Sequence, residues 1–265
     1  MNPGFAQTPL EGLVILASVS ILFFLVVLVS SWKRVGIGKD MTKGFMVGGA
    51  QLALVSIILM ALIEWEGEGT MWLPAAAVMI TGMAIISAAR SARRSPDMPS
   101  AFRTTAASIS LGSVLSLSVL LVADAIPLRP EFVIPLAGMA FGNSMDICSL
   151  TLDRMTREFQ TGRGMIETRL SLGATSSQAV EEIDRMAIRT ALIPTIDRMK
   201  TLGIIFIPGA MAGLIMAGVQ PLVAAQFQLV IFLMIVGGGV ITSLATVTLA
   251  RESFFNEQHQ LQDWV

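Results

Sequence analysis

Long runs of uncharged residues alternate with short charged segments along this chain. Four runs without Asp, Glu, Lys or Arg hold 18 to 21 residues each and cover positions 12–32, 44–63, 72–89 and 104–123. Because a helix rises about 1.5 Å per residue, a run of this length can cross the roughly 30 Å hydrocarbon core of a bilayer. The pattern predicts four membrane-spanning helices in the first half of the chain.

The second half contains two further runs. One covers residues 132–145 and extends to Leu152 when a single carboxylate, Asp146, is allowed within it. The other, residues 201–250, holds 50 uncharged residues and is interrupted near Gln220-Pro221, where we expect a turn between two spans. The sequence therefore predicts an all-α, polytopic membrane bundle with about seven transmembrane helices.

Composition supports a membrane protein and excludes several classes of enzyme. The AVILMFWYC set makes up 54% of the 265 residues, and only 14% are charged. The 18 basic and 19 acidic residues nearly cancel, which gives no charge basis for binding nucleic acid. A single cysteine and a single histidine exclude a disulfide framework, a zinc cluster and a serine protease, and no Walker A motif is present. We expect a non-enzymatic chain that does not itself hydrolyse ATP.

Basic residues are concentrated after the first and third predicted spans. Because cytoplasmic loops carry an excess of Lys and Arg, these two loops are expected to face the cytoplasm. With seven spans, this places the N-terminus outside, the C-terminus inside, and the protein in the cytoplasmic (inner) membrane as a multi-pass protein. The residues concerned are Lys33, Arg34, Lys39 and Lys43 after the first span, and Arg90, Arg93, Arg94 and Arg103 after the third.

One charged segment interrupts the membrane-like pattern. Residues 151–200 carry 15 of the 37 formal charges. Thr175 and Gln178 fit the capping-box pattern, which predicts that a helix begins there. A stripe of Ala179, Ile183, Met186 and Thr190 would lie on one face of it. We interpret 1–265 as a single permease domain in which 151–186 is a cytoplasmic helical coupling segment; a solvated tether between two spans is the alternative.

The segment resembles the EAA loop of ABC-transporter permeases, the loop that docks on the ATPase. Glu167 is followed after five residues by Gly173, and Ile183 lies ten positions further on, while Thr168 and Arg169 replace the two alanines of the motif. The resemblance implies that this part of the chain contacts an ATPase. The residues to which it assigns this coupling role are Glu167, Arg169, Leu170, Gly173, Ala174, Thr175 and Gln178.

A second resemblance covers residues 134–218. Its blocks are IPLAGM at 134–139, GNSM at 142–145, LSLGAT at 170–175, IRTALIPT at 188–195 and PGAMAGLIMAG at 208–218. In that order they are similar to FetB-type permeases, the membrane half of a two-component ABC transporter associated with iron export. The resemblance implies a homodimer of this chain in the lipid bilayer and a separate FetA-like ATPase. It implies no cofactor in this chain, since ATP and magnesium belong to the partner.

Asp146 is the first candidate for a substrate ligand, because carboxylates within membrane spans are costly and are usually functional. With Asn143, Met139, Met145 and Cys148 nearby, it offers hard and soft donors suited to a metal cation. The alternative is that Asp146 marks the membrane interface and pairs with Arg154 or Arg157. Asp197 is a second candidate, for which an interfacial ion pair with its basic neighbours is the alternative.

Prolines mark predicted hinges. Pro194, Pro208 and Gly209 would interrupt helices beside the candidate site, as in transporters with discontinuous helices. We therefore expect an ABC permease exporting iron or another metal cation. The alternatives are an ABC permease for a metabolite such as a nucleotide sugar, with which relatives have also been linked, and an ATP-independent secondary transporter or channel. An intramembrane aspartyl protease is disfavoured because the chain lacks a Gly-x-Gly-Asp motif.

Overall fold

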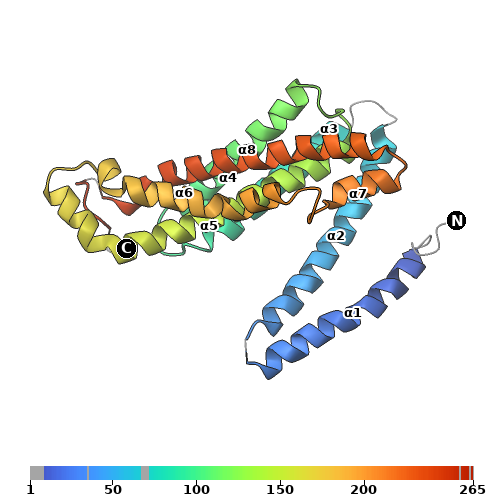
Figure 1. The fold of residues 1–265 in the computed structure, drawn as a ribbon, viewed down its shortest axis with the longest axis horizontal. Helices are drawn as coiled ribbons and strands as arrows, with labels where there is room; N and C mark the ends of the chain where they lie inside the picture. The colour runs from blue at the N-terminus through green and yellow to red at the C-terminus, as the bar shows by residue number, and fades with distance from the viewer. Residues whose placement is uncertain (1–8, 35, 67–71, 257, 263, 265) are drawn as a thin grey trace. The chain divides into compact units, whose positions relative to one another are not determined.

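The described chain is helical almost throughout. The computed structural model describes residues 9–34, 36–66, 72–256, 258–262 and 264. In this part of the chain there are eight helices and no strand, so the predicted all-α fold of a polytopic membrane protein is confirmed (Figure 1). The helices are α1 (Pro9–Trp32), α2 (Gly38–Glu66), α3 (Trp72–Ala92), α4 (Ala101–Val122), α5 (Pro130–Ser171), α6 (Ser176–Lys200), α7 (Gly209–Met216) and α8 (Pro221–Phe254).

Among the described residues, six helices are long and apolar enough to cross a membrane: α1 to α5 and α8. The first five cover the first five predicted spans to within one residue. The uncharged runs locate these helices because a charge inside hydrocarbon is expensive and a helix satisfies its own backbone polar groups.

The sixth predicted span needs correction. The first half of the run 201–250 forms no single spanning helix: α6 ends at Lys200, residues 201–208 are non-helical, and α7 has only eight residues. Gly203 adopts a φ of 82°, and the N–H groups of Ile205 and Phe206 both donate to the carbonyl oxygen of Thr201 at 3.1 Å. Pro208 then caps α7 with a fixed φ. Any crossing here uses α6, the non-helical segment and α7 in series.

The chain divides into two compact units. The first, residues 1–64, contains α1 and nearly all of α2, with the rings of Phe23 and Phe45 stacked at a centroid distance of 4.7 Å between the two helices. The second, residues 65–265, contains α3 to α8. The candidate site for the substrate lies wholly in the second unit.

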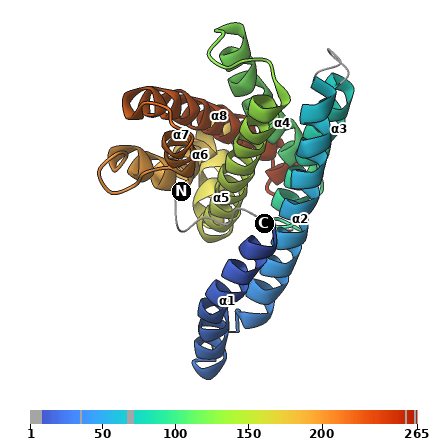
Figure 2. The same ribbon diagram turned by 90° about the vertical axis from the view of Figure 1, so that its right-hand side faces the viewer.

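Helices α5 and α8 run in the same direction, side by side. Asn143 Nδ2 donates to the carbonyl oxygen of Ile235 at 3.0 Å, and the hydroxyls of Thr151 and Ser243 lie 3.2 Å apart. Each of these contacts joins residues 92 positions apart, which fixes a parallel register. Figure 2 looks along this bundle and shows α6 beside α5, with α4 and α8 also packed against α5.

A close helix crossing joins α4 to α8. A Cβ added to Gly238 would lie 2.7 Å from the Ser116 hydroxyl and 3.1 Å from the carbonyl oxygen of Gly112. The face of α4 that carries small residues four positions apart, Ser108, Gly112 and Ser116, is therefore a packing face, as expected when backbones approach closely in lipid. Other glycines at this spacing, Gly142 and Gly213 among them, meet no neighbour within 4 Å of an added Cβ.

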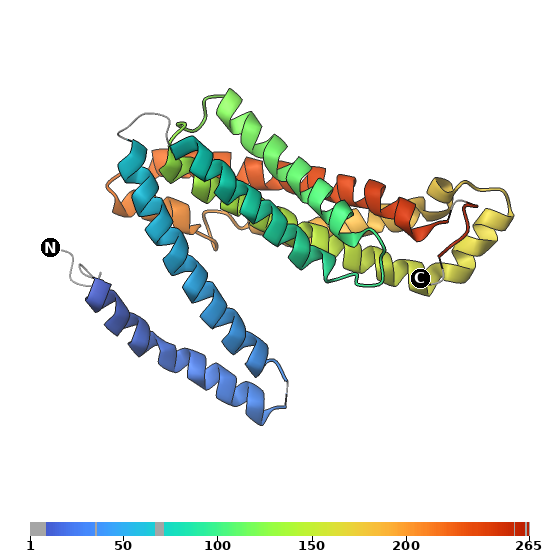
Figure 3. The ribbon, with the colours of Figure 1, turned by 180° about the vertical axis from the view of Figure 1, so that it is seen from behind.

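Helix α5 is too long to lie only within a bilayer. Its 42 residues extend about 63 Å, roughly twice the hydrocarbon thickness. Its last turns and the first turns of α6 form an antiparallel hairpin, which carries the α5–α6 turn well past the α3–α4 turn (Figure 3). Gly173, in this turn, adopts a φ of 93°, a left-handed conformation that favours glycine.

Candidate functional site

A pocket of about 570 Å³ lies between α5, α6, α8 and the non-helical segment before α7. We call it the α5–α8 pocket. Its walls include the aromatic rings of Phe206 and Phe232, and Pro208 and Gly209 from the start of α7. The polar groups that line it come from three different helices: Asn143 and Asp146 from α5, Thr195 and Arg198 from α6, and Gln228 from α8.

The pocket brings together half of the predicted metal ligands. Met139, Asn143 and Asp146 line it, because positions i, i+4 and i+7 share one face of a helix. Asn143 uses its Nδ2 to hold α8, which leaves Oδ1 as an acceptor toward the pocket.

The other three predicted ligands lie outside it. Cys148 is fully buried and accepts a hydrogen bond from the Thr246 hydroxyl at 3.3 Å, so its sulfur faces α8. Met145 packs against the hydrophobic core. Asp197 is exposed and forms an ion pair with Lys200 at 3.4 Å, the interfacial arrangement considered as its alternative role.

Asp146 has no ion-pair partner in the described part of the chain. Arg154 and Arg157, the basic residues proposed as its structural partners, pair instead with Glu158 at 2.7 Å and Asp153 at 3.2 Å. Arg198, across the pocket on α6, lies close enough to act electrostatically on Asp146. The pocket thus holds one acidic and one basic group that face a common space without an ion pair between them.

Sequence reasoning missed three polar residues of this pocket, Thr195, Arg198 and Gln228. Gln228 is 5% exposed, and its Oε1 has no hydrogen-bond partner among the described residues. A buried polar atom without a partner is uncommon in native proteins. The signal available in the sequence was the presence of amide side chains, at Gln220, Gln226 and Gln228, in a run of 50 uncharged residues. Arg198 had no such signal, because its approach to α5 depends on the α5–α6 hairpin.

The described residues contain no group of three or more His, Cys, Asp or Glu side chains that could hold a metal ion. A cation in the pocket would therefore rely on Asp146, on amide oxygens and on its own water or ligands. Such a loose donor set suits a substrate in transit better than a permanently bound metal.

The end of the hairpin is the second candidate site. Residues 151–186 form the coupling hairpin, which consists of the second half of α5, the turn and the first turns of α6. The predicted capping box is present: Gln178 N–H donates to Thr175 Oγ1 at 3.3 Å, and Thr175 N–H donates to Gln178 Oε1 at 2.9 Å. Leu172, at the tip, is 83% exposed.

Arg169 braces this turn. Its Nη1 donates to the carbonyl oxygen of Ala179 at 3.0 Å, and its Nη2 pairs with Glu182 at 3.4 Å. The N–H of Ala174 donates back to the carbonyl oxygen of Arg169 at 3.1 Å, which closes the end of α5. Arg169 therefore fixes the angle between α5 and α6 at the tip, whereas Leu172 projects from it.

A buried ion pair links α6 to the last turn of α8. Asp184 on α6 is 4% exposed and pairs with Arg251. The buried face of this helix runs through Val180, Ile183 and Ala187, not through the exposed Met186. Burial raises the pKa of Asp184, and the Arg251 guanidinium opposes this shift.

The chain after α8 folds back onto the hairpin. The rings of Phe159 and Phe254 stack at 4.1 Å, and Trp264 lies 4.8 Å from Phe254. His259 Nδ1 lies 3.0 Å from the hydroxyl of Ser176, the first residue of α6. Gln258 to Leu261, with Glu167, Leu170 and Ala174, line a groove of about 570 Å³. Three of the predicted coupling residues therefore share a surface with the C-terminal segment.

The predicted hinge residues occupy different environments. Pro194 lies inside α6, which continues through it to Lys200. Pro208 and Gly209 stand at the boundary between the non-helical segment and α7, and both line the α5–α8 pocket. A change of angle at this boundary would change the shape of the pocket directly.

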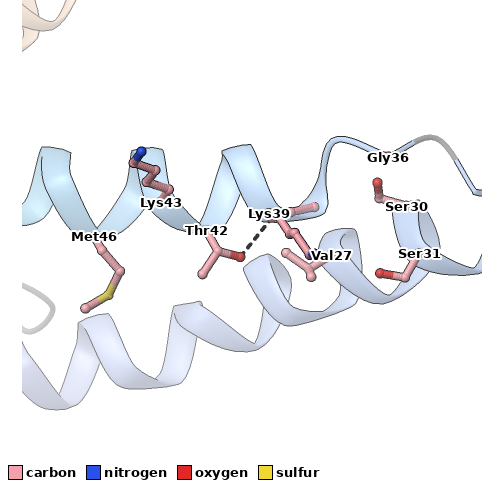
Figure 4. A pocket seen from close by; sticks show the side chains of 9 residues that line it. Val27, Ser30, Ser31, Gly36, Lys39, Thr42, Lys43 and Met46 are labelled. Carbon is pink, nitrogen blue, oxygen red and sulfur yellow. Dashed lines mark hydrogen bonds between the residues drawn. The ribbon is translucent and has the colours of Figure 1, made fainter.

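A separate pocket of about 740 Å³ lies in the first unit, near the α1–α2 turn. It is lined by hydroxyls of Ser30 and Thr42 and by Lys39 and Lys43 (Figure 4). In Figure 4 the Lys43 side chain points away from α1, and Thr42 uses its hydroxyl to donate to the carbonyl oxygen of Gly38. No predicted ligand lies here, so we place the substrate site in the second unit.

Comparisons with known proteins agree with these observations. The sequence pattern of the uncharacterised protein family UPF0014 matches residues 13–255. The UPF0014 membrane protein STAR2 of Oryza sativa subsp. japonica is 31% identical over 99% of this chain and 90% of its own length. Protein ALUMINUM SENSITIVE 3 of Arabidopsis thaliana is 30% identical over 97% of this chain and 92% of its own.

A bacterial relative carries a functional name. The probable iron export permease protein FetB of Escherichia coli (strain K12) is 31% identical over 93% of each chain. No solved structure matches this protein. The family pattern and the relatives extend over nearly the whole sequence, including the spans before residue 134, where the sequence blocks gave no resemblance. The chain therefore belongs to the UPF0014 family and is a FetB-type, multi-pass membrane permease.

Proposed function

We propose that this chain is the membrane-spanning subunit of an ABC transporter. Two copies would form the pathway in the cytoplasmic membrane, and a separate FetA-like ATPase would supply the energy by hydrolysing magnesium-bound ATP. The cargo would be iron or another metal cation, moved outward, as the name of the bacterial relative suggests. Transport by the chain alone is the competing hypothesis.

The observation that carries this proposal is the coupling hairpin. It is an extension of α5 that leaves the bundle, ends in a braced turn and exposes Leu172. A tether between two spans needs neither the Arg169 brace nor an exposed leucine at its tip. Both are useful if the tip inserts into a partner and transmits force without bending.

The hairpin is also connected to the pocket. Asp184 and Arg251 tie α6 to the end of α8, and α5, α6 and α8 all contribute walls to the α5–α8 pocket. A rigid-body movement of the tip would therefore change the spacing of Asp146 on α5, Arg198 on α6 and Gln228 on α8. ATP binding can drive such a change only if the ATPase contacts the tip differently in the two states.

Leu172→Glu is expected to separate the ATPase from the permease. A central apolar contact of an interface is worth about 2 kcal/mol or more, so affinity for the ATPase should fall roughly thirtyfold or more. Because Leu172 is exposed, the membrane domain should keep its thermal stability. The measurement is co-purification and substrate-stimulated ATP hydrolysis in lipid, with the ATPase encoded by the same organism.

Gln160→Glu is the matched control, since it adds the same charge at an exposed position of α5 twelve residues before the tip. It should leave binding and hydrolysis unchanged. Unaltered stimulation in the Leu172→Glu complex would contradict docking at the tip. If the wild-type chain binds no ATPase and passes ions alone in vesicles, the proposal of an ABC transporter is wrong.

Asp146→Ala is expected to weaken cation binding by about tenfold or more, because it removes the negative charge that the pocket offers to a cation. Asp197→Ala removes a carboxylate that lies outside the pocket and pairs with Lys200, so it should leave affinity unchanged. Isothermal titration of the purified chain with ferrous ions under anaerobic conditions compares the two variants. Equal affinities would remove Asp146 from the binding site.

A further inference from the structure

We propose that the α5–α8 pocket recognises a cation together with an organic hydroxycarboxylate ligand, with Gln228 and Arg198 as the specificity-determining residues. The inference rests on the proposed role of this pocket as the transport site and concerns what the pocket accepts. The parallel register of α5 and α8 fixes how far apart the residues at the two ends of the pocket lie.

Gln228 and Asp146 lie at opposite ends of the pocket. The bond between Asn143 and Ile235 sets these two residues at the same level. Gln228 lies seven residues before Ile235 on α8, and Asp146 lies three residues beyond Asn143 on α5. Because the helices are parallel, these offsets add to about 15 Å along the bundle at roughly 1.5 Å per residue. A bare metal ion, with ligands at about 2.0 to 2.6 Å, cannot contact both groups.

The unpartnered Gln228 oxygen indicates that the end of the pocket at Gln228 also takes part in binding. A buried acceptor without a donor costs free energy, which is recovered if a ligand supplies an N–H or O–H group there. Isoleucine, leucine or methionine would fill the same space in this apolar helix without that cost. A cation held at Asp146 is too far along the bundle to reach this amide oxygen, which therefore points to a second group, a hydrogen-bond donor carried by a ligand bound together with the cation.

The end of the pocket at Asp146 favours a ligand that carries both a positive and a negative charge. Asp146 attracts a cation, but Arg198 lines the same pocket and acts electrostatically on the same carboxylate. A lone cation would be attracted by one group and repelled by the other. A cation accompanied by a carboxylate satisfies both, because the guanidinium group binds carboxylate oxygens well.

Between the two ends, the walls are mostly apolar. Phe206, Ile231, Phe232 and Ile235 face this space. A carbon skeleton can pack against such side chains, whereas the hydration shell of a free ion would lose hydrogen bonds there. A carbon skeleton along the aromatic rings, a donor group toward Gln228 and a metal–carboxylate group beside Asp146 and Arg198 would use the groups at both ends of the pocket.

The test compares ferrous ions with and without citrate, under anaerobic conditions, on the purified chain in lipid nanodiscs. We expect citrate to raise the affinity for iron by about tenfold or more, the value of one charge-assisted contact. Gln228→Leu and Arg198→Gln should each abolish most of that gain, so that each variant binds iron about equally well with and without citrate. Gln228→Leu should not lower the melting temperature, because it removes an unsatisfied buried oxygen.

Gln226→Leu is the matched control, because Gln226 lies two residues away on α8, is exposed and does not line the pocket. It should behave as the wild type. The inference would be overturned if the wild type bound ferrous ions more tightly without citrate than with it. It would also be overturned if Gln228→Leu and Arg198→Gln left binding of the citrate complex unchanged. Failure of the citrate complex to bind would also overturn it. Substrate-stimulated hydrolysis by the assembled ATPase complex is scored separately, so the transporter proposal can survive either result.

Discussion

Replacing Gly112 with leucine is expected to abolish the folded bundle, and replacing it with alanine should cost about 1 to 3 kcal/mol. A Cβ at this position would lie 2.5 Å from the carbonyl oxygen of Gly238 and even closer to the Thr242 hydroxyl. Both atoms belong to α8, and one of them is backbone, so α4 and α8 would have to move apart. Thermal unfolding followed by size-exclusion chromatography in detergent measures the effect.

Gly82→Ala provides the comparison, since an added Cβ at Gly82 in α3 meets nothing within 4 Å. It should keep or slightly raise the melting temperature, because alanine favours a helix over glycine by about 0.8 to 1.0 kcal/mol. If Gly112→Ala and Gly82→Ala had the same melting temperature, the close approach of α4 and α8 would not contribute to stability. A small-residue spacing in the sequence would then be insufficient to identify a packing face.

The spanning helices could be predicted well, because each corresponds to an uncharged run long enough to cross a bilayer. Residues 201–218 were predicted less well, because they are also uncharged but do not form one long helix. That segment is uncharged, but residues 201–208 are non-helical and contain Gly203 in a left-handed conformation. Pro208 then precedes the short helix α7. Local hydrogen bonds pair part of the backbone of this segment, as when the N–H groups of Ile205 and Phe206 donate to the Thr201 carbonyl oxygen, so a lack of charge does not require a helix there.

The candidate pocket could be predicted only in part. Met139, Asn143 and Asp146 belong to one helix, so their spacing places them together. Arg198 and Gln228 come from elements 52 and 82 positions after Asp146. Their meeting with α5 depends on the hairpin and on the parallel register of α8, which no periodicity encodes. For the same reason the sequence grouped Cys148 and Met145 with Asp146, although they face other parts of the bundle.

The coupling hairpin illustrates a different limit. Its capping box was visible because Thr175 and Gln178 are three residues apart, and the contact is local. Most charges in a mixed-charge helix are exposed, and the buried carboxylate of Asp184 is an exception. Its burial depends on Arg251, 67 positions later, which supplies the compensating charge. A long-range ion pair of this kind cannot be recognised from the pattern of one helix.

The same ion pair gives the second large effect. Asp184→Ala should lower the free energy of unfolding by about 3 to 5 kcal/mol, because it leaves the partly buried Arg251 without its counter-ion. Glu181→Ala, on the same helix, removes an exposed partner of Arg185 and should cost no more than about 0.5 kcal/mol. Reversible unfolding of the two variants in mixed micelles compares them. Similar losses would show that Asp184 contributes no more than a surface charge.

The pH dependence of this contact has a defined sign. Burial raises the folded-state pKa of Asp184 above its ordinary value, so between the two values the folded chain binds more protons than the unfolded chain. Stability linked to this group therefore increases as the pH falls through that window and decreases as the pH rises through it. Asp184→Asn removes the titration but keeps the size, and the margin of the wild type over this variant should widen on acidification.

The Asp184→Asn variant also tests how movement reaches the pocket. The ion pair with Arg251 joins the hairpin to α8, which supplies Gln228, whereas Leu172 is exposed at the tip, where we propose that the ATPase binds. Arg251 Nη1 also donates to the Ser177 hydroxyl at 2.9 Å, so Arg251 joins the end of α8 to the start of α6 as well as to Asp184. In a folded Asp184→Asn complex we expect normal ATPase binding but reduced stimulation by substrate, whereas Leu172→Glu loses both. Full stimulation in Asp184→Asn would mean that α5 alone carries the movement from the tip to the pocket.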